Sequence, residues 1–280
     1  MRILILGGTA SARELATWLR SRNEHRIIFS FAGRTDEPAL PEPSDTPDTP
    51  DMHVRIGGFG GTDGLAAYLR AESIDVLIDA THPFAQAISE HAISAANAAE
   101  VRLLTLRRPA WTPQPGDRWT HVPSVPDAAR RVAALPDSGC VLVTTGRSQL
   151  EAYAQDERHA YLIRTVTTPT GALPPRHIVV LDRGPYTVEG ESALMERHGV
   201  CALVTKNSGG ESTEAKLTAA RQRNIPVIIV DPPATPAEVT GITPATSVTT
   251  TAEILCLLDE MDEPAGRAAP SAGGVRSDRP

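Results

Sequence analysis

Short apolar runs alternate with segments of helical periodicity along almost the whole of this 280-residue chain. The apolar runs have the length of buried strands, and the segments between them repeat their apolar residues every three to four positions. Alternation of this kind predicts an α/β fold, in which mainly parallel sheets are covered by helices on both faces. The predicted strands are Arg2–Leu6, Arg26–Phe31, Asp75–Asp79, Val101–Leu106, Cys140–Thr144, Tyr161–Thr165, His177–Leu181, Val200–Thr205 and Pro226–Val230. The predicted helices are Ser11–Arg20, Thr62–Ala71, Ala85–Ala99, Ser148–Tyr153, Val188–Arg197, Glu211–Arg223 and Thr251–Met261.

The alternation occurs twice, on either side of residues 109–126, a stretch with five prolines. Prolines at this density interrupt regular structure and are typical of a domain junction. We therefore expect one domain over residues 1–110, a second over 111–262 and a disordered tail over 263–280. Residues 35–51 hold five prolines and six acidic residues without a base, which predicts a loop without regular structure.

The overall composition excludes several classes of protein. The net charge of −7 disfavours a nucleic-acid surface, and most of that charge lies in residues 35–51 and the tail, so the folded body is close to neutral. The chain has no apolar run long enough to span a membrane and begins without a signal-peptide pattern. Cys140, Cys201 and Cys256 lie far apart without metal-ligand spacing, which favours reduced thiols in a cytoplasmic protein and no metal site.

Two motifs in the first half indicate a nucleotide site. Ile3–Arg13 joins a strand to a helix through Gly7, Gly8 and Thr9, the arrangement in which backbone N–H groups receive a phosphate. An ordinary tight turn would have the same residues. Gly33 and Arg34 follow the second strand, where an arginine would suit the 2′-phosphate of NADPH; the alternative is a solvated loop arginine.

Two further motifs lie at predicted helix starts. Arg55–Gly61 places four glycines around Phe59, which frees the backbone to approach a ligand through Gly58 and Gly60, or makes a hinge. Asp75–Ala85 ends a strand and continues into Thr81 and His82, at the strand end where ligands of open α/β sheets bind. Thr81 could equally cap the helix, and a single histidine is more often structural.

Cations follow the strands of the second half. Each alone reads as a surface charge, but the carboxyl ends of parallel strands meet at one sheet edge, where clustered cations suit a ligand with several carboxylates. The residues concerned are Arg147, Arg164, Arg183 and Lys206, with Tyr186, Asn207 and Ser208 beside them.

Taken in order, these motifs resemble the precorrin-6A reductase family of cobalamin biosynthesis. The matching pieces are GGT…R, AGR, RIGGFGG, DATHPFA, RPAW, TGR, RGPYTVEGE and VTKNSGGESTEAKL, between about residues 2 and 232. The resemblance implies two Rossmann-like domains that exchange an edge strand, with a ligand cleft between them. It also implies NADPH as hydride donor, with NADH as the alternative, and a tetrapyrrole substrate with many carboxylates, reduced from precorrin-6A to precorrin-6B.

The resemblance gives the motif residues their expected roles. The cofactor would contact Gly7, Gly8, Thr9, Arg13, Gly33, Arg34, Gly58, Phe59, Gly60 and Thr81. Substrate carboxylates would pair with Arg147, Arg164, Arg183, Lys206, Asn207 and Ser208, while His82 would lie near the nicotinamide and Lys206 or Tyr186 would donate the proton. Two other functions fit parts of the sequence: a non-catalytic sensor of NADP(H), which would not need the strand-end cations, and a methyltransferase of the same pathway.

Overall fold

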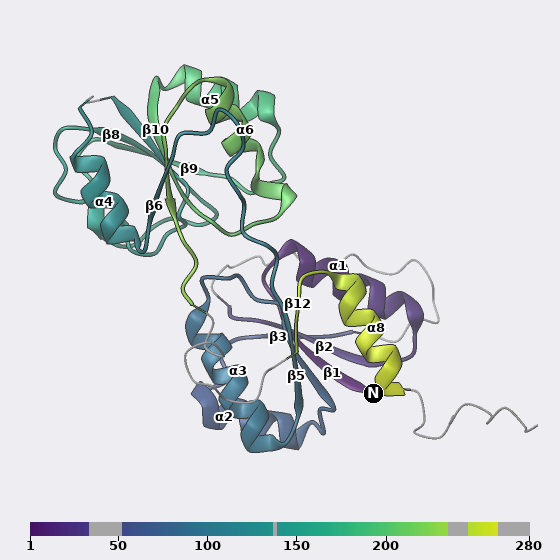
Figure 1. Cartoon of the computed structure of the whole chain (residues 1–280). Coiled ribbons are helices and arrows are strands. Elements are labelled where there is room, and N and C mark those ends of the chain that lie inside the picture. Colours follow the sequence, from purple (N-terminus) through teal and green to yellow (C-terminus); the bar gives the residue numbers. More distant parts are fainter. Residues whose placement is uncertain (34–51, 137–138, 235–245, 263–280) are drawn as a thin grey trace, which may run out of the picture.

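The computed structural model describes residues 1–33, 52–136, 139–234 and 246–262. The described chain forms two six-stranded sheets in which every pair of neighbouring strands is parallel (Figure 1). The first sheet has the order β12-β5-β4-β1-β2-β3 and the second β6-β11-β10-β7-β8-β9. The first sheet consists of β1 (Arg2–Leu6), β2 (Arg26–Phe31), β3 (His53–Ile56), β4 (Val76–Asp79), β5 (Arg102–Leu106) and β12 (Thr246–Val248). The second consists of β6 (Trp119–Val122), β7 (Cys140–Val143), β8 (Ala160–Thr165), β9 (His177–Leu181), β10 (Val200–Lys206) and β11 (Val227–Val230).

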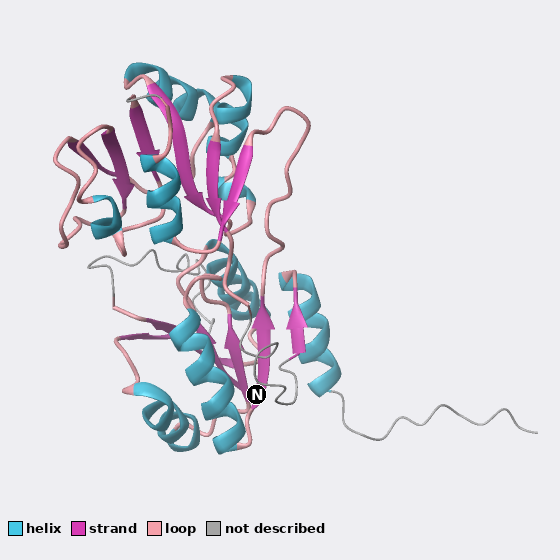
Figure 2. Cartoon of the chain, turned by 60° about the vertical axis from the view of Figure 1, so that its left-hand side comes forward, coloured by secondary structure: helices cyan, strands magenta, loops and turns pink. Residues whose placement is uncertain are grey.

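Helices cover both faces of each sheet, as the alternating pattern predicts (Figure 2). On the first sheet, α1 (Ala10–Arg22) and α8 (Thr251–Asp262) share one core, while α2 (Gly61–Ala71) and α3 (Gln86–Ala99) share the other. On the second, α4 (Val125–Ala133) and the 3-10 turn η1 (Leu150–Tyr153) oppose α5 (Val188–Arg197) and α6 (Ala215–Gln222). A second 3-10 turn, η2 (Glu211–Thr213), leads into α6. No helix of the described ranges is both long and apolar enough to cross a membrane.

The two sheets exchange their last strands. After β5 the chain leaves the first sheet, and the next strand, β6, pairs with β11 in the second. After β11 the chain returns, and β12 pairs with β5 at the edge of the first sheet. Helix α8 follows β12 and buries Ile254, Leu255 and Leu258 in the core beside α1. The assignment of all of 111–262 to the second domain is therefore wrong for 246–262, since that segment completes the first core.

Several short elements differ from the predictions. Strands β3, β6 and β12 lie at sheet edges and are only partly buried, so their sequences lack a continuous apolar run. Part of the proline-rich 109–126 stretch is regular structure, because Ser124 caps α4 and Pro126 occupies its first turn, where proline is tolerated. The predicted helix Ser148–Tyr153 is the turn η1, and the predicted helix Glu211–Arg223 divides into η2 and α6. Residues 35–51 and the tail lie outside the described residues.

Strand order determines where a ligand can lie. In the first sheet the chain adds β2 and β3 on one side of β1, and β4, β5 and β12 on the other side. In the second sheet β8 and β9 lie on one side of β7, and β10, β11 and β6 lie on the other. The order in which strands are added therefore reverses between β1 and β4 and between β7 and β10. Loops at such a reversal diverge above and below the sheet and leave a crevice at the carboxyl ends of the strands. In the first sheet, Gly7–Thr9 and Ala80–Phe84 follow the two strands at this point. In the second sheet, Thr144–Arg147 and Asn207–Gly210 do so.

Candidate functional site

The turn from β1 to α1 uses its two glycines for different purposes. A side chain at Gly7 would meet the ring of Phe29 at 2.4 Å, so this glycine is required by packing. Gly8 has φ +119° and faces open space, which leaves its backbone free to approach a ligand. The Thr9 hydroxyl caps α1 by accepting from Ala12 N at 3.1 Å and donates to Ala80 O at 2.9 Å. Thr9 therefore fixes the helix start to the loop after β4.

A cavity of about 910 Å³ opens at the carboxyl ends of β1 to β4. Most of the residues predicted to hold the cofactor line it, namely Gly7, Gly8, Gly33, Gly58, Phe59, Gly60 and Thr81. The Arg55 guanidinium donates to Gly58 O at 2.8 Å and lies 3.8 Å from the centre of the Phe59 ring. These two contacts stabilise the glycine loop. Arg34 lies outside the described residues.

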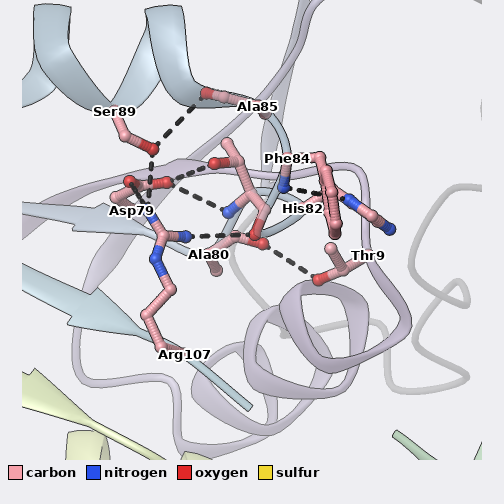
Figure 3. A network of polar contacts seen from close by, with 9 residues as sticks. Thr9, Asp79, Ala80, His82, Phe84, Ala85, Ser89 and Arg107 are labelled. Atoms are coloured by element: carbon pink, nitrogen blue, oxygen red, sulfur yellow. Dashed lines mark hydrogen bonds and ion pairs between the residues drawn. The ribbon is translucent and has the colours of Figure 1, made fainter. Parts of the chain in front are cut away.

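A buried polar network shapes the loop after β4 (Figure 3). Asp79, only 2% exposed, accepts from the Thr81 hydroxyl at 2.6 Å and from Arg107 Nη2 at 2.8 Å. The same Arg107 nitrogen donates to Ser89 Oγ at 2.7 Å, at the start of α3. The Thr81 hydroxyl donates to Asp79 and so stabilises the loop, while Thr81 also lines the cavity, and its contact with the cofactor stays a prediction.

His82 lies at the tip of this loop and is neutral. Its Nδ1 accepts from Phe84 N at 3.2 Å, so the proton of the neutral ring is on Nε2. Burial, followed by the nearby charges of Lys206, Arg108, Arg107 and Lys216, lowers the pKa of His82 to about 4. His82 can therefore donate a hydrogen bond from Nε2 near neutral pH, but it does not carry a proton to give as an acid.

Phe84 joins the loop to the second domain. Its ring packs against the core formed by α4, η1 and the second sheet. Lys206, the last residue of β10, places its ammonium 5.1 Å from the centre of that ring, and burial lowers the pKa of Lys206. The loop after β4 and the loop after β10 therefore meet at the boundary between the domains.

A second cavity, of about 570 Å³, lies between the domains at this boundary. It shares Gly8, Phe31 and His82 with the larger cavity, so the two spaces adjoin at these residues. Arg13 from α1 faces Arg183 from the loop after β9, and burial together with the Arg183 charge lowers the pKa of Arg13. The sequence predicts that Arg13 contacts the cofactor, but its position in the shared cleft makes it equally available to a ligand of the second domain.

The predicted substrate contact Arg164 and the predicted proton donor Tyr186 both have partners within the protein. Arg164 is 7% exposed and forms an ion pair of 2.7 Å with buried Glu191, so its charge is already compensated. Its guanidinium also lies 3.8 Å from the centre of the Tyr186 ring. The Tyr186 hydroxyl donates to Asp182 O at 3.3 Å, and burial raises its pKa. Tyr186 and Arg183 line the cleft, but the Arg164 side chain supports it from beneath.

Asn207 also has a structural partner. Its amide accepts from Trp111 N at 2.8 Å and donates to Trp111 O at 3.2 Å, which fixes the chain that crosses from β5 to β6. A side chain at Gly209 would meet Pro109 O at 2.1 Å, so glycine is needed here for the crossing chain to pass close to this loop. Ser208 lines the cleft, and Arg147, at the same sheet edge, is exposed with its guanidinium 3.3 Å from the Thr167 hydroxyl.

Four residues at or beneath the cavities are absent from the predicted site: Asp79, Arg107, Arg108 and Lys216. In the sequence Asp79 marks only the end of a strand, and nothing pairs it with Arg107. Arg108 lies within the RPAW motif, lines the cleft and has its pKa lowered by burial. Lys216 lies in the TEAKL motif but is 4% exposed beneath the cleft. A basic residue on the apolar face of α6 was the available signal.

Fold and cavities together define a two-domain α/β protein of the Rossmann-like type, with a nucleotide-sized cavity in one domain that adjoins a basic cleft between the two. The chain belongs to the family of precorrin-6x reductases CbiJ/CobK, whose model matches residues 2–258. It is thus an oxidoreductase.

Known relatives support the family assignment over most of the chain. A precorrin-6A reductase of Rhodococcus erythropolis is 45% identical over 238 residues, which cover 84% of this chain and 91% of the relative. One from Rhodobacter capsulatus is 44% identical, with 84% and 90% covered. The solved structure of CobK precorrin-6A reductase superposes with a TM-score of 0.81 at 38% identity, covering 94% of this chain and 97% of that one.

Proposed function

We propose that this protein reduces precorrin-6A to precorrin-6B in cobalamin biosynthesis, with NADPH as the hydride donor. The observation that carries this proposal is the junction of two cavities at Gly8, Phe31 and His82. A reductase must bring a hydride donor and an acceptor into contact and exclude water from them. A nucleotide cavity that opens onto a second, basic cleft satisfies that requirement.

The first domain has the features that a dinucleotide needs. Gly8 presents open backbone at the start of α1, where the helix dipole favours a phosphate. The cavity of about 910 Å³ is large enough for a cofactor of this size, and the glycine loop braced by Arg55 forms one of its walls. NADPH, when bound, supplies the hydride. The neutral His82 ring at the inner end of the cavity would donate its Nε2–H to a polar group there.

The second domain supplies cations for a polycarboxylate substrate. Arg13, Arg108 and Arg183 line the cleft, and Lys206 lies at its margin beside Phe84. Guanidinium groups bind carboxylates through paired hydrogen bonds, which orients the ligand as well as holding it. Arg147 is available at the same edge, whereas Arg164 and Asn207 act by positioning their neighbours.

Proton delivery to the reduced macrocycle requires an acid near neutral pH. Lys206 is the best candidate among the residues at the cleft, because burial lowers its pKa toward the working range. Tyr186 has a raised pKa and therefore releases its proton reluctantly. His82 is neutral, so we assign to it the orientation of the nicotinamide or the substrate.

The direct test is an anaerobic assay of NADPH oxidation with precorrin-6A as substrate, followed by mass spectrometry of the tetrapyrrole. We expect loss of NADPH absorbance only when both are present, and a product about 2 Da heavier. Unchanged absorbance with a substrate preparation that a known reductase consumes would contradict the proposal. It would instead favour a non-catalytic NADP(H) sensor, which would bind the nucleotide without turnover.

A further inference from the structure

Lysine is nearly absent from this chain. Of its 27 basic residues other than histidine, 25 are arginine, and the two lysines are Lys206 and Lys216. Lys206 is the last residue of β10, and Lys216 lies in α6, the next α-helix along the chain. Arginine remains charged under all ordinary conditions, whereas lysine loses its proton readily when buried. A chain that otherwise uses arginine thus has its only two lysines beside the cleft between its domains.

Lys216 lies directly beneath that cleft. Its side chain enters from the start of α6, and its ammonium donates to the carbonyl of Thr213, a residue that lines the cleft. The ammonium also lies 4.8 Å from the centre of the Trp111 ring, on the chain that crosses between the domains. With 4% of its surface exposed, Lys216 is shielded from bulk water.

Charged groups surround Lys216, but no ion pair in the described part of the chain includes it. Arg164 on β8 and Glu191 on α5 form a buried pair, so Glu191 is shared between two cations. Glu214, in the turn before α6, provides a further negative charge, and His82 faces the group from the first domain as a neutral ring. Burial, followed by the Arg164 charge, lowers the pKa of Lys216 to about 7, although both carboxylates act in the opposite direction.

The charged form of a buried amine is costly when no carboxylate touches it, and among the described residues none touches Lys216, so an incoming anion would lower that cost. We propose that Lys216 couples substrate binding to proton uptake: its amine takes a proton from solvent when a carboxylate group of the substrate enters the cleft. The inference rests on the proposed function, since it requires a polycarboxylate ligand. Lys216 is on this account a positioning residue, which completes the positive charge of the cleft only when the substrate is present.

The scarcity of lysine makes a direct test possible in the unaltered protein. Protein labelled with ¹³C at lysine Cε has two side-chain signals, and the variant Lys206→Arg retains only that of Lys216. Each signal reports the protonation of its amine during a pH titration. The probe is cobyrinic acid, a stable corrin with several carboxylates, added in the presence of NADP⁺, and its binding is followed by the corrin absorbance.

We expect Lys216 to titrate near pH 7 without the probe and about one pH unit or more higher with it. Calorimetry at pH 8 in two buffers of different ionisation enthalpy should show proton uptake on binding. The variant Lys216→Arg should still bind the probe but without that uptake.

Three results would overturn the inference. If the probe binds while the Lys216 midpoint stays in place, or if Lys216→Arg takes up as many protons as the native protein, the coupling is refuted and the proposed function stands. If the native protein does not bind the probe at all, the coupling and the polycarboxylate substrate class both fail.

Discussion

At the scale of single residues, His82 makes the stability of the protein depend on pH. The unfolded imidazole binds a proton near pH 6.5, while the folded one does so only near pH 4, so acid favours the unfolded chain. Between pH 7 and pH 5 this difference costs about 2 kcal/mol of folding free energy. We expect the free energy of unfolding of His82→Gln, measured with denaturant, to fall between pH 7 and pH 5 by about that much less than that of the native protein. Equal falls in the variant and the native protein would show that His82 is already protonated in the fold.

Arg13 and Arg183 face one another across the cleft, and guanidinium groups on both walls suit a carboxylate ligand between them. Replacing Arg13 by Met should raise the KM for the tetrapyrrole about tenfold, since a charge-assisted hydrogen bond contributes roughly 1.5–3 kcal/mol. The KM for NADPH should change little. Arg130→Met, at an exposed arginine of α4, is the matched control. A rise confined to the KM for NADPH would show instead that Arg13 contacts the cofactor, as the sequence motif predicts.

At the scale of elements, the β1–α1 turn has two adjacent glycines with different roles: Gly7 is required by packing, and Gly8 faces the space where a ligand would bind. Gly7→Ala forces a methyl group against Phe29 and should destabilise the protein by about 1–3 kcal/mol, as overpacking does. Gly8→Ala meets no neighbouring atom but must adopt φ +119°, so it should move the backbone that faces the nucleotide. We expect Gly8→Ala to weaken NADPH binding more than Gly7→Ala, measured by fluorescence titration. The reverse order would place the phosphate elsewhere.

The elements also show what a sequence can predict. Central strands such as β1 and β10 are buried on both faces, so their apolar runs mark them clearly. Edge strands are half exposed, and β12 pairs with a sheet whose other strands lie far away in sequence, which no local pattern reveals. The same holds for the site. Glycine loops and strand-end cations could be located from their spacing, but the partners of Arg164 and Asn207 depend on tertiary contacts.

At the scale of the whole molecule, the return of β12 and α8 makes the first domain depend on both ends of the chain. Val248, Ile254 and Leu258 complete the core beside α1, although the intervening chain belongs to the other sheet. A chain ending at Ala234 lacks β12 and α8 and should lose the first domain while the second stays folded. Proteolysis should then yield a resistant fragment covering β6 to β11. An intact first domain that still binds NADPH would contradict this dependence.

The central claim is that hydride passes from a nucleotide in the first domain to a ligand in the interdomain cleft, where Gly8, Phe31 and His82 border both cavities. The most direct measurement is a single turnover of precorrin-6A with NADPH carrying deuterium at one or the other C4 position. Because a fixed site presents one face of the nicotinamide, one stereoisomer should transfer its deuterium and give a product about 1 Da heavier than the other does. A product without deuterium from either stereoisomer, formed while NADPH is consumed, would contradict direct transfer between the two cavities.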